Sequence, residues 1–228
     1  MAGTLSIVAT PIGNLEDITL RALSVLKTAE VIAAEDTRVV KKLLSKYEIP
    51  APRFISIKSY ASKSAVDAIV SALRDGVMVA LVSDAGTPGL ADPGAEVVAA
   101  VRGQLPEARI VPIPGPSAIA TALSASGIVG DSFWFAGFPP HKKGRETFFD
   151  TVAASKETVV VYESPHRIKK ALESLNERAP ERTITVAREL TKLFEEIVPA
   201  TAAEHLVRME SDPKKALGEF VLILSPGK

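Results

Sequence analysis

VMVALV (residues 77–82) and the segment that follows it, SDAGTPGLADPG (residues 83–94), decide the fold. The first is apolar at every position, so both faces of a strand built from it must be buried. A strand of this kind is typical of the centre of a parallel sheet that carries helices on both faces. The second segment is rich in glycine and proline, which indicates a loop directly after that strand. We therefore expect a central strand whose carboxyl end opens into a loop of small residues.

Strand-like and helix-like patterns alternate on either side of this central strand. Further strands are expected at residues 5–9, 31–34, 54–57 and 109–112. Apolar residues recur at helical spacing between them, in residues 18–29, 38–47, 64–74, 94–102 and 117–126. Alternation of this kind predicts a parallel sheet with right-handed crossovers.

The second half of the chain predicts another α/β unit. Strands are expected at residues 132–137, 158–162, 183–187 and 219–224, and helices at residues 148–154, 168–176 and 202–209. A polar, basic loop at residues 139–145 follows the first of these strands. We place the boundary after residue 128, which gives an N-terminal α/β domain with a parallel sheet at residues 1–128 and a C-terminal α/β domain at residues 129–228.

The composition narrows the possible chemistry. Hydrophobic residues make up 46% of the 228 and charged residues 24%, as in soluble globular proteins. The absence of cysteine excludes a thiolate zinc site, a disulfide framework and a cysteine nucleophile. The three histidines share no ligand spacing, so we expect no metal site. No apolar run approaches the roughly 18 residues of a membrane span and no signal-peptide pattern is present, so we expect a cytoplasmic protein without a membrane partner.

The net charge gives no general affinity for nucleic acid. The 27 basic and 27 acidic residues balance, whereas most nucleic-acid-binding proteins have a basic excess. Binding of RNA would therefore have to come from local basic patches. An enzyme that acts on a small molecule stays an alternative on this ground.

Ligands of open α/β sheets bind beyond the carboxyl ends of the strands, so the loops at that edge are the candidate sites. The loop at residues 10–14 has only Gly13 where a dinucleotide-binding fold needs several glycines, and Pro11 lacks an N–H donor. NAD and FAD are therefore disfavoured, although Glu35 or Asp36 could stand for the acid that binds a ribose.

Two later loops combine small residues with polar ones. In residues 83–94, the small residues around Gly86 let a ligand lie against the backbone, and Asp84 can accept hydrogen bonds from hydroxyl or ammonium groups. A tight turn without a ligand is the alternative. In residues 112–118, prolines stiffen the chain and Ser117 can cap the helix that follows, which by itself would explain that serine.

A fourth loop, at residues 162–167, contains charged side chains. Glu163 closes a buried strand, and Arg167 lies near the start of the next helix. A carboxylate acceptor together with a guanidinium suits a site for a hydroxyl or a phosphate. The alternative is an ion pair at the surface, which would stabilise the fold little.

Seven strings of sequence, taken in order, resemble the tetrapyrrole methylase superfamily. They are ATPIGNLEDIT (9–19), AAEDTR (33–38), SDAGTPGLADPG (83–94), PIPGPSA (112–118), GFPPHKKGR (137–145), YESPHRI (162–168) and ARELTK (187–192). Together they are most similar to the branch that methylates the ribose 2′-hydroxyl of a cytidine in 16S ribosomal RNA. The first loop lacks the G-x-G-x-G of members that act on corrinoids, which favours this RNA branch.

The resemblance implies a class III methyltransferase in which two α/β domains enclose a ligand cleft. S-adenosylmethionine would lie in the cleft and leave as S-adenosylhomocysteine, and the acceptor would be 16S ribosomal RNA of the 30S subunit. The family suggests a homodimer, and its members usually continue for some tens of residues past the last strand, so this chain is expected to be short or trimmed. The positions implied to contact the cofactor are Pro11, Asp84, Gly86, Thr87, Ser117, Ala118, Tyr162, Ala187 and Glu219.

A ribose hydroxyl is a weak nucleophile, so methyl transfer to it needs a base or a hydrogen-bond acceptor. Four acids follow strands in loops implied to face the cleft, the first two being preferred: Glu163, Asp36, Glu35 and Glu189. An ordinary cap or ion pair is the alternative for each acid.

Phosphate contacts would make RNA binding weaken as salt rises. The basic side chains expected to make them are Arg38, Lys142, Lys143, Arg145 and Arg167, with Lys41 and Lys42 better explained by a solvated helix face. Two other functions stay open: methylation of a tetrapyrrole by the same fold, and a non-catalytic RNA-binding α/β protein. The second would not explain two loops of small residues with acids at strand ends.

Overall fold

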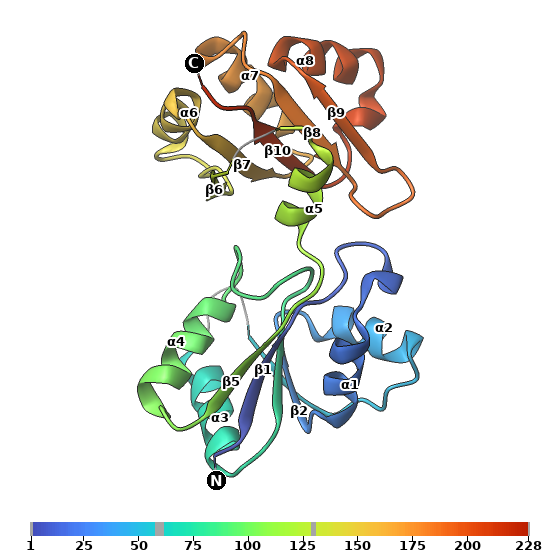
Figure 1. Ribbon diagram of the computed structural model, residues 1–228, viewed down its shortest axis with the longest axis vertical. Coiled ribbons are helices and arrows are strands. Elements are labelled where there is room, and N and C mark those ends of the chain that lie inside the picture. Colours follow the sequence, from blue (N-terminus) through green and yellow to red (C-terminus); the bar gives the residue numbers. More distant parts are fainter. Residues whose placement is uncertain (1, 58–61, 129–130, 228) are drawn as a thin grey trace. The chain divides into compact units, whose positions relative to one another are not determined.

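The computed structural model describes residues 2–57, 62–128 and 131–227, and the chain folds as two compact units, Met1–Ser117 and Ala118–Lys228 (Figure 1). We expected a boundary after residue 128, whereas the units divide after Ser117, because helix α5 (Ala118–Ala125) packs on a strand of the second unit. Residues 129 and 130, beside the expected boundary, lie outside the described residues. Within the described ranges, no helix is long and apolar enough to cross a membrane.

The first unit is built on a five-stranded sheet in the order β3-β2-β4-β1-β5. Its strands are β1 (Thr4–Val8), β2 (Val31–Ala34), β3 (Arg53–Ser56), β4 (Val79–Val82) and β5 (Arg109–Ile113). Strand β4 lies between β2 and β1 and is buried at all four positions, which confirms the central strand predicted within residues 77–82. All four strand pairs are parallel, as the alternation of strands and helices predicts.

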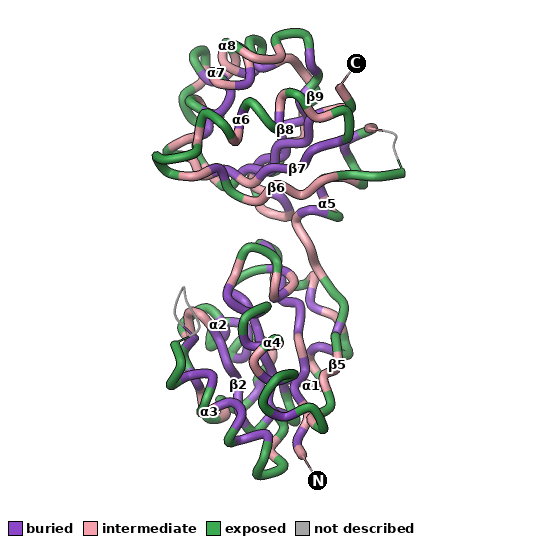
Figure 2. The backbone as a smooth tube through the Cα atoms, turned by 90° about the vertical axis from the view of Figure 1, so that its left-hand side faces the viewer, coloured by how far each residue is buried: buried purple, intermediate pink, exposed green. Residues whose placement is uncertain are grey.

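Helices cover both faces of this sheet. They are η1 (Leu15–Asp17), α1 (Leu20–Thr28), α2 (Thr37–Lys46), α3 (Lys63–Arg74) and α4 (Gly94–Gln104). Successive side chains of a strand point to opposite faces, so Leu81 joins the core formed with α3 and α4, while Ala80 and Val82 join the core formed with α1 and α2. The inner strands β1, β2 and β4 therefore form the buried centre of the unit (Figure 2).

Polar caps fix where the first two helices begin. The Thr19 hydroxyl accepts a hydrogen bond from the Ala22 N–H at 3.1 Å. Asp36, two residues beyond β2, accepts one from the Arg38 N–H at 2.8 Å. Since a cap of this kind satisfies an N–H that the helix leaves free, it also holds the Asp36 side chain at the edge of the sheet.

The second unit contains a mixed sheet of five strands in the order β6-β7-β10-β8-β9. Its strands are β6 (Phe133–Gly137), β7 (Thr158–Glu163), β8 (Ile184–Arg188), β9 (Glu196–Ala200) and β10 (Phe220–Leu224). Only β6 and β7 pair in parallel among these neighbours. The sequence did not predict β9, which is an edge strand containing Pro199. Proline cannot donate to a sheet, so it weakens the sequence signal of a strand and is tolerated at an edge.

The helices of the second unit form a layer on one face of this sheet. They are α6 (Arg145–Ala154), α7 (Ile168–Arg178), α8 (Ala202–Ser211) and η2 (Pro213–Ala216). Their buried side chains share a core with Val161, Val186 and Leu222. Helix α5 lies on the opposite face, where the Thr185 hydroxyl donates to the Ser126 carbonyl at 3.5 Å (Figure 1). Alternate residues of β7, β8 and β10 therefore face α5.

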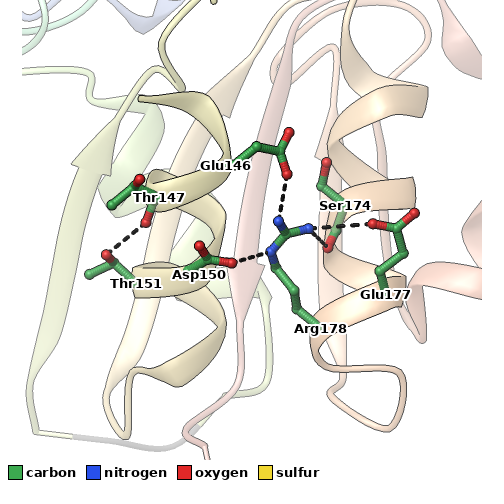
Figure 3. A network of polar contacts seen from close by, with 7 residues as sticks. All are labelled: Glu146, Thr147, Asp150, Thr151, Ser174, Glu177 and Arg178. Atoms are coloured by element: carbon green, nitrogen blue, oxygen red, sulfur yellow. Dashed lines mark hydrogen bonds and ion pairs between the residues drawn. The ribbon is translucent and has the colours of Figure 1, made fainter. Parts of the chain in front are cut away.

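An arginine joins α6 to α7. Arg178 of α7 donates to Glu146 at 2.5 Å and to Asp150 at 2.6 Å, both on α6, and it also bonds the Ser174 carbonyl of its own helix (Figure 3). The two carboxylates are largely exposed. Because water screens exposed ion pairs, this network contributes little to stability.

A second arginine, Arg182, is buried and binds backbone carbonyls. Its guanidinium donates to the carbonyls of Val152 and Ala153 at the end of α6, at 2.9 and 3.1 Å. It also donates to the carbonyls of Glu157 at 2.9 Å and Ser225 at 2.6 Å. This one side chain therefore ties the end of α6 to the segments before β7 and after β10.

Candidate functional site

Four loops of the first unit emerge at one edge of its sheet, because all of its strands run in parallel. Two backbone hydrogen bonds join the β1 loop to the β4 loop: the Thr10 N–H donates to the Gly86 carbonyl at 2.9 Å, and the Gly86 N–H donates to the Thr10 carbonyl at 3.0 Å. The Thr10 hydroxyl also donates to the Ser83 carbonyl at 3.3 Å. These two loops are therefore held as one piece.

The β4 loop turns at Gly86, whose φ is +77°. A Cβ atom there would lie 3.3 Å from Cγ2 of Ile12 and 3.6 Å from the Pro116 carbonyl oxygen. The next residue, Thr87, donates its hydroxyl to the same Pro116 carbonyl at 3.1 Å, which ties the β4 loop to the β5 loop. Glycine at this position thus lets the loop turn between its neighbours, and Asp84 of the same loop is exposed.

Asp84 joins the β4 loop to the β2 loop. Its Oδ1 accepts the Asp36 N–H at 2.8 Å. The Asp84 side chain is exposed at the sheet edge, and an ionised carboxylate can accept several hydrogen bonds. It can therefore bind hydroxyl or ammonium donors of a ligand while it keeps the two loops together.

The two acids after β2 differ in ionisation. Burial, followed by the negative charges of Asp84, Asp92 and Asp36, raises the pKa of Glu35. Among the described residues, no hydrogen bond engages the Glu35 carboxylate. In contrast, hydrogen bonds from the side chain and backbone of Arg38 lower the pKa of Asp36 to about 2. A carboxylate with a raised pKa accepts a proton more readily, so Glu35 is better suited to act as a base than Asp36.

Asp92 is engaged inside its own loop. Its two oxygens accept the Gly89 N–H at 2.9 Å each, and Oδ1 accepts the Gly94 N–H at 2.7 Å. The predicted site residues that the first unit brings to this edge are Pro11, Glu35, Asp36, Asp84, Gly86, Thr87 and Ser117.

Predicted cofactor positions of the second unit lie on the face of the sheet that carries α5. Tyr162 and Ala187 flank Val221 in one row across β7, β10 and β8. Burial raises the pKa of Tyr162 to about 12, although a hydrogen bond with the backbone of Ile119 in α5 acts to lower it. The Tyr162 hydroxyl therefore stays protonated. Ala187 is fully buried, and Ala118 begins α5.

Glu163 faces the other side of this sheet. It follows Tyr162 directly, so its side chain points toward the layer of α6 and α7. The Glu163 side chain is 0% exposed and pairs with Arg167 at 3.0 Å and with Arg145 at 3.5 Å. An ion pair is thus formed, as in the alternative considered from the sequence, but it is buried rather than at the surface, and Glu163 does not share a face with Tyr162 and Ala187.

Glu189 and Glu219 brace the turn after β8. Glu189 has a φ of 50°, and its Oε1 accepts the Glu219 N–H at 2.9 Å and the Lys192 ammonium at 3.0 Å. Burial opposes ionisation of Glu189, but these hydrogen bonds outweigh it and lower its pKa. Lys192 also binds Glu219 at 2.9 Å. Both acids therefore have structural partners in this turn.

The predicted basic residues of the second unit fall into two groups. Lys142 and Lys143 are exposed in the segment before α6. The side chains of Arg145 and Arg167 are only 13% and 18% exposed, and both point inward to Glu163. Only the two lysines are therefore presented to a large polyanion.

The basic residues near β2 also differ in whether their charge is already paired. Arg38 is 85% exposed but pairs with Asp36 at 2.6 Å. Lys41 lies over the ring of Phe54, with 5.1 Å between Nζ and the ring centroid. Lys42 is exposed on α2. These three residues belong to the first unit, whereas Lys142 and Lys143 belong to the second.

Sequence reasoning did not single out Thr10 or Pro116, although both hold the site loops together. Thr10 contacts residues 73 positions away along the chain, and Pro116 accepts a hydrogen bond from Thr87, 29 positions away. No local pattern signals such bonds. Within the described residues, no three acids or histidines gather closely enough to hold a metal ion.

Comparison with known proteins gives one consistent family. Residues 4–205 match the family model described as Tetrapyrrole (Corrin/Porphyrin) Methylases. The chain is 45% identical to Ribosomal RNA small subunit methyltransferase I of Neisseria meningitidis serogroup B, over 100% of this chain and 78% of that protein. It is 42% identical to the protein of the same name from Bacillus subtilis, over 97% of this chain and 75% of that protein.

Solved structures share the fold at low sequence identity. The methyltransferase CobJ is 20% identical and superposes with a TM-score of 0.71, over 99% of this chain and 95% of that one. Uroporphyrin-III C-methyl transferase from Thermus thermophilus, in complex with S-adenyl homocysteine, is 17% identical with a TM-score of 0.66, over 98% and 97% of the two chains. At this identity the likeness concerns the fold alone.

Proposed function

The chain belongs to the tetrapyrrole (corrin/porphyrin) methylase family, and from this premise we propose that it transfers the methyl group of S-adenosylmethionine to the ribose 2′-hydroxyl of a cytidine in 16S ribosomal RNA. The resemblance predicted from the seven strings is confirmed, as is the α/β fold. The observation that carries the proposal is 42–45% identity, over nearly the whole chain, to enzymes named for small-subunit ribosomal RNA. Methylation of a tetrapyrrole is less well supported, because the corrinoid-type relatives share only the fold.

The edge of the first sheet suits S-adenosylmethionine. This donor carries a positive sulfonium and an ammonium group, and the edge carries the exposed carboxylate of Asp84 beside Glu35 and Asp36. Glycine at position 86 keeps side-chain atoms away from the turn between Ile12 and Pro116. We propose that Asp84 and Thr87 bind the donor from this unit and that Tyr162, Ala187 and Glu219 contribute from the second.

The residues of the chain would then act on the acceptor. S-adenosylmethionine supplies, when bound, an electrophilic methyl group with a neutral leaving group. We propose that Glu35 accepts the proton of the 2′-hydroxyl, because its raised pKa and lack of a hydrogen-bond partner among the described residues suit a base. Asp36 has its oxygens occupied by Arg38, which argues against the same role.

We propose that the acceptor is the RNA within the 30S subunit, which is found in the cytoplasm. We also propose that the active form is a homodimer. Lys142 and Lys143 would contact phosphates, because they are exposed and, among the described residues, form no ion pair with a carboxylate. Sedimentation of the purified protein tests the dimer. A monomer at micromolar concentration would refute it.

The test of the activity combines binding and transfer. Calorimetric titration with S-adenosylmethionine should give saturable heat. Labelled methyl should then pass to 30S subunits and not to uroporphyrinogen, and nuclease digestion should recover the label as a 2′-O-methylated cytidine. In Glu35→Gln, donor binding should persist while kcat falls by about 10²–10⁴-fold. Transfer to the tetrapyrrole instead, or no saturable binding of the donor, would refute the proposal.

A further inference from the structure

We propose that Glu163 is a positioning residue for the RNA substrate: through Arg145 and Arg167 it fixes the segment at residues 138–144, which presents Lys142 and Lys143 to RNA phosphates. The inference rests on the proposed function for the identity of the polyanion. It assigns to Glu163 a role different from that of a general base, and it removes the two arginines from the set of direct RNA contacts.

The carboxylate of Glu163 has partners on both of its oxygens. Oε1 accepts the Ser164 N–H at 2.7 Å and pairs with Nε of Arg167 at 3.0 Å. Oε2 pairs with Nη2 of Arg145 at 3.5 Å. A base must contact the group whose proton it takes, whereas this carboxylate has no exposed surface. Its position fits a group that orients the two guanidiniums.

The same guanidiniums bind the segment at its proline end. Nη1 of Arg167 donates to the Pro139 carbonyl at 2.9 Å, and Nη1 of Arg145 donates to the Pro140 carbonyl at 3.4 Å. Proline has no N–H and a fixed φ, so its carbonyl is the only backbone group through which it can be held. Glu163 thus connects, through one arginine each, to two consecutive prolines.

Two further contacts and one turn restrict the segment. The ring of Phe138 lies 5.3 Å from that of Tyr162, between centroids. The Arg145 N–H donates to the Lys142 carbonyl at 3.2 Å, which closes the turn before α6. Gly144, with a φ of 84°, then leads into the helix. The two lysines are therefore held at a turn that is fixed on both sides.

Phosphate is the ligand chemistry that fits what this segment exposes. Residues 141–143, HKK, are all exposed, and residues 138–144 contain no acid. Among the described residues, no ion pair joins Lys142 or Lys143 to a carboxylate. Ammonium groups held in place on a rigid turn lose less conformational entropy on binding than groups on a free loop, so fixing the turn strengthens binding.

The first experiment separates a positioning role from a catalytic one. Glu163→Gln removes the negative charge and keeps the shape of the side chain. We expect its KM for 30S subunits to rise about tenfold while kcat stays within about twofold, because binding rather than the transition state is affected. A fall in kcat of about 10²-fold or more at unchanged KM would instead identify a base and overturn the proposal.

The second readout does not depend on RNA. Trypsin cleaves after Lys142 and Lys143, so limited proteolysis reports how firmly the segment is held. Glu163→Gln should be cut there several times faster than the wild type. Arg178→Gln is the matched control, because it breaks an ion-pair network between the same helices, α6 and α7, without a contact to residues 138–144 (Figure 3). Equal cutting of Glu163→Gln and the wild type would overturn the proposal.

A double-mutant cycle connects the two readouts. Replacing Lys142 and Lys143 together by alanine should raise KM and lower the salt slope of binding by about 2. If Glu163 acts through these lysines, Glu163→Gln should add little in that background, whereas an additive effect would overturn the proposal. Should Glu163→Gln not fold, Arg145→Met removes the longer of the two pairings and takes its place. A wild type that does not methylate ribosomal RNA would refute the proposed function, and the trypsin comparison would still decide whether Glu163 holds the segment.

Discussion

Replacement of Gly86 by alanine tests whether the turn of the β4 loop needs a residue that adopts a positive φ without strain. Alanine at a φ of +77° costs about 1–2 kcal/mol, because its Cβ crowds the carbonyl oxygen that follows. Alanine has less conformational freedom than glycine in the unfolded chain, which stabilises the folded state by about 0.4–1 kcal/mol. The 3.3 Å approach of the new Cβ to Ile12 adds to the cost. We therefore expect Gly86→Ala to destabilise the first unit by about 1 kcal/mol or slightly more.

Gly103→Ala is the matched control in the same unit. Gly103 lies in α4, is exposed, and a Cβ there would meet no atom within 4 Å. Alanine is favoured over glycine inside a helix by about 0.5–1 kcal/mol, so this substitution should stabilise the unit. The same chemical change therefore has opposite expected signs at the two positions.

Urea unfolding followed by far-ultraviolet circular dichroism measures both variants against the wild type. A calorimetric melt should show Gly86→Ala lower by about 3–5 °C in the transition of the first unit. The melt should be repeated with S-adenosylmethionine, whose stabilising shift should shrink in Gly86→Ala and persist in Gly103→Ala. If both alanine variants were stabilised to the same extent, the turn at position 86 would not require glycine and the reasoning about the site loops would be refuted.

Three further predictions concern single side chains. Arg182→Met should destabilise the second unit by about 3 kcal/mol in urea unfolding, because it leaves buried carbonyls unpaired. The exposed network of Arg178 contributes less, so Arg178→Gln should cost less than about 1 kcal/mol. Equal costs would contradict the stabilising role given to Arg182. Glu35 binds its proton more tightly in the folded than in the unfolded state, so ionised Glu35 destabilises the fold. The Glu35→Gln variant should therefore be more stable than the wild type at pH 7, and this gain in stability should vanish below about pH 4. A gain in stability that does not depend on pH would exclude this cause. Asp84→Asn keeps an acceptor for the Asp36 N–H but loses the charge, so calorimetry should show about tenfold weaker binding of S-adenosylmethionine with unchanged stability, and unchanged affinity would remove Asp84 from the site.

Much of the first unit follows from local sequence. Strand β4 is apolar at every position, so its burial between two parallel neighbours was predictable. The cap at Asp36 was equally local, since aspartate before a run of helix-forming residues indicates a helix start. What the sequence did not give is the division after Ser117. A short helix of small residues such as α5 fits either unit, and only its packing on β10 assigns it to the second.

The second unit shows where local reasoning ends. Strand β9 escaped prediction because it lies at an edge and contains Pro199. Helix α6 begins at Arg145 rather than at residue 148, because its first residues are charged and carry no apolar signal. At the candidate site, alternation along β7 predicts that Tyr162 and Glu163 point to opposite faces. It does not predict that α6 and α7 cover the face of Glu163, which depends on how distant segments pack.

The balanced net charge conceals two local environments of opposite sign. At the edge of the first sheet, burial and then the charges of Asp84, Asp92 and Asp36 raise the pKa of Glu35, as expected where several carboxylates gather. We expect such an edge to attract a cationic methyl donor and to repel RNA phosphates, so the ribose that approaches Glu35 must be held there by phosphate contacts elsewhere. The sulfur of the product is neutral, so we expect the same carboxylates to bind the product less strongly than the donor. In the proposed function, the RNA phosphates bind instead to the exposed Lys142 and Lys143 of the second unit. Because each neutralised phosphate releases counterions, rising salt should weaken the binding of RNA more steeply than the binding of the donor.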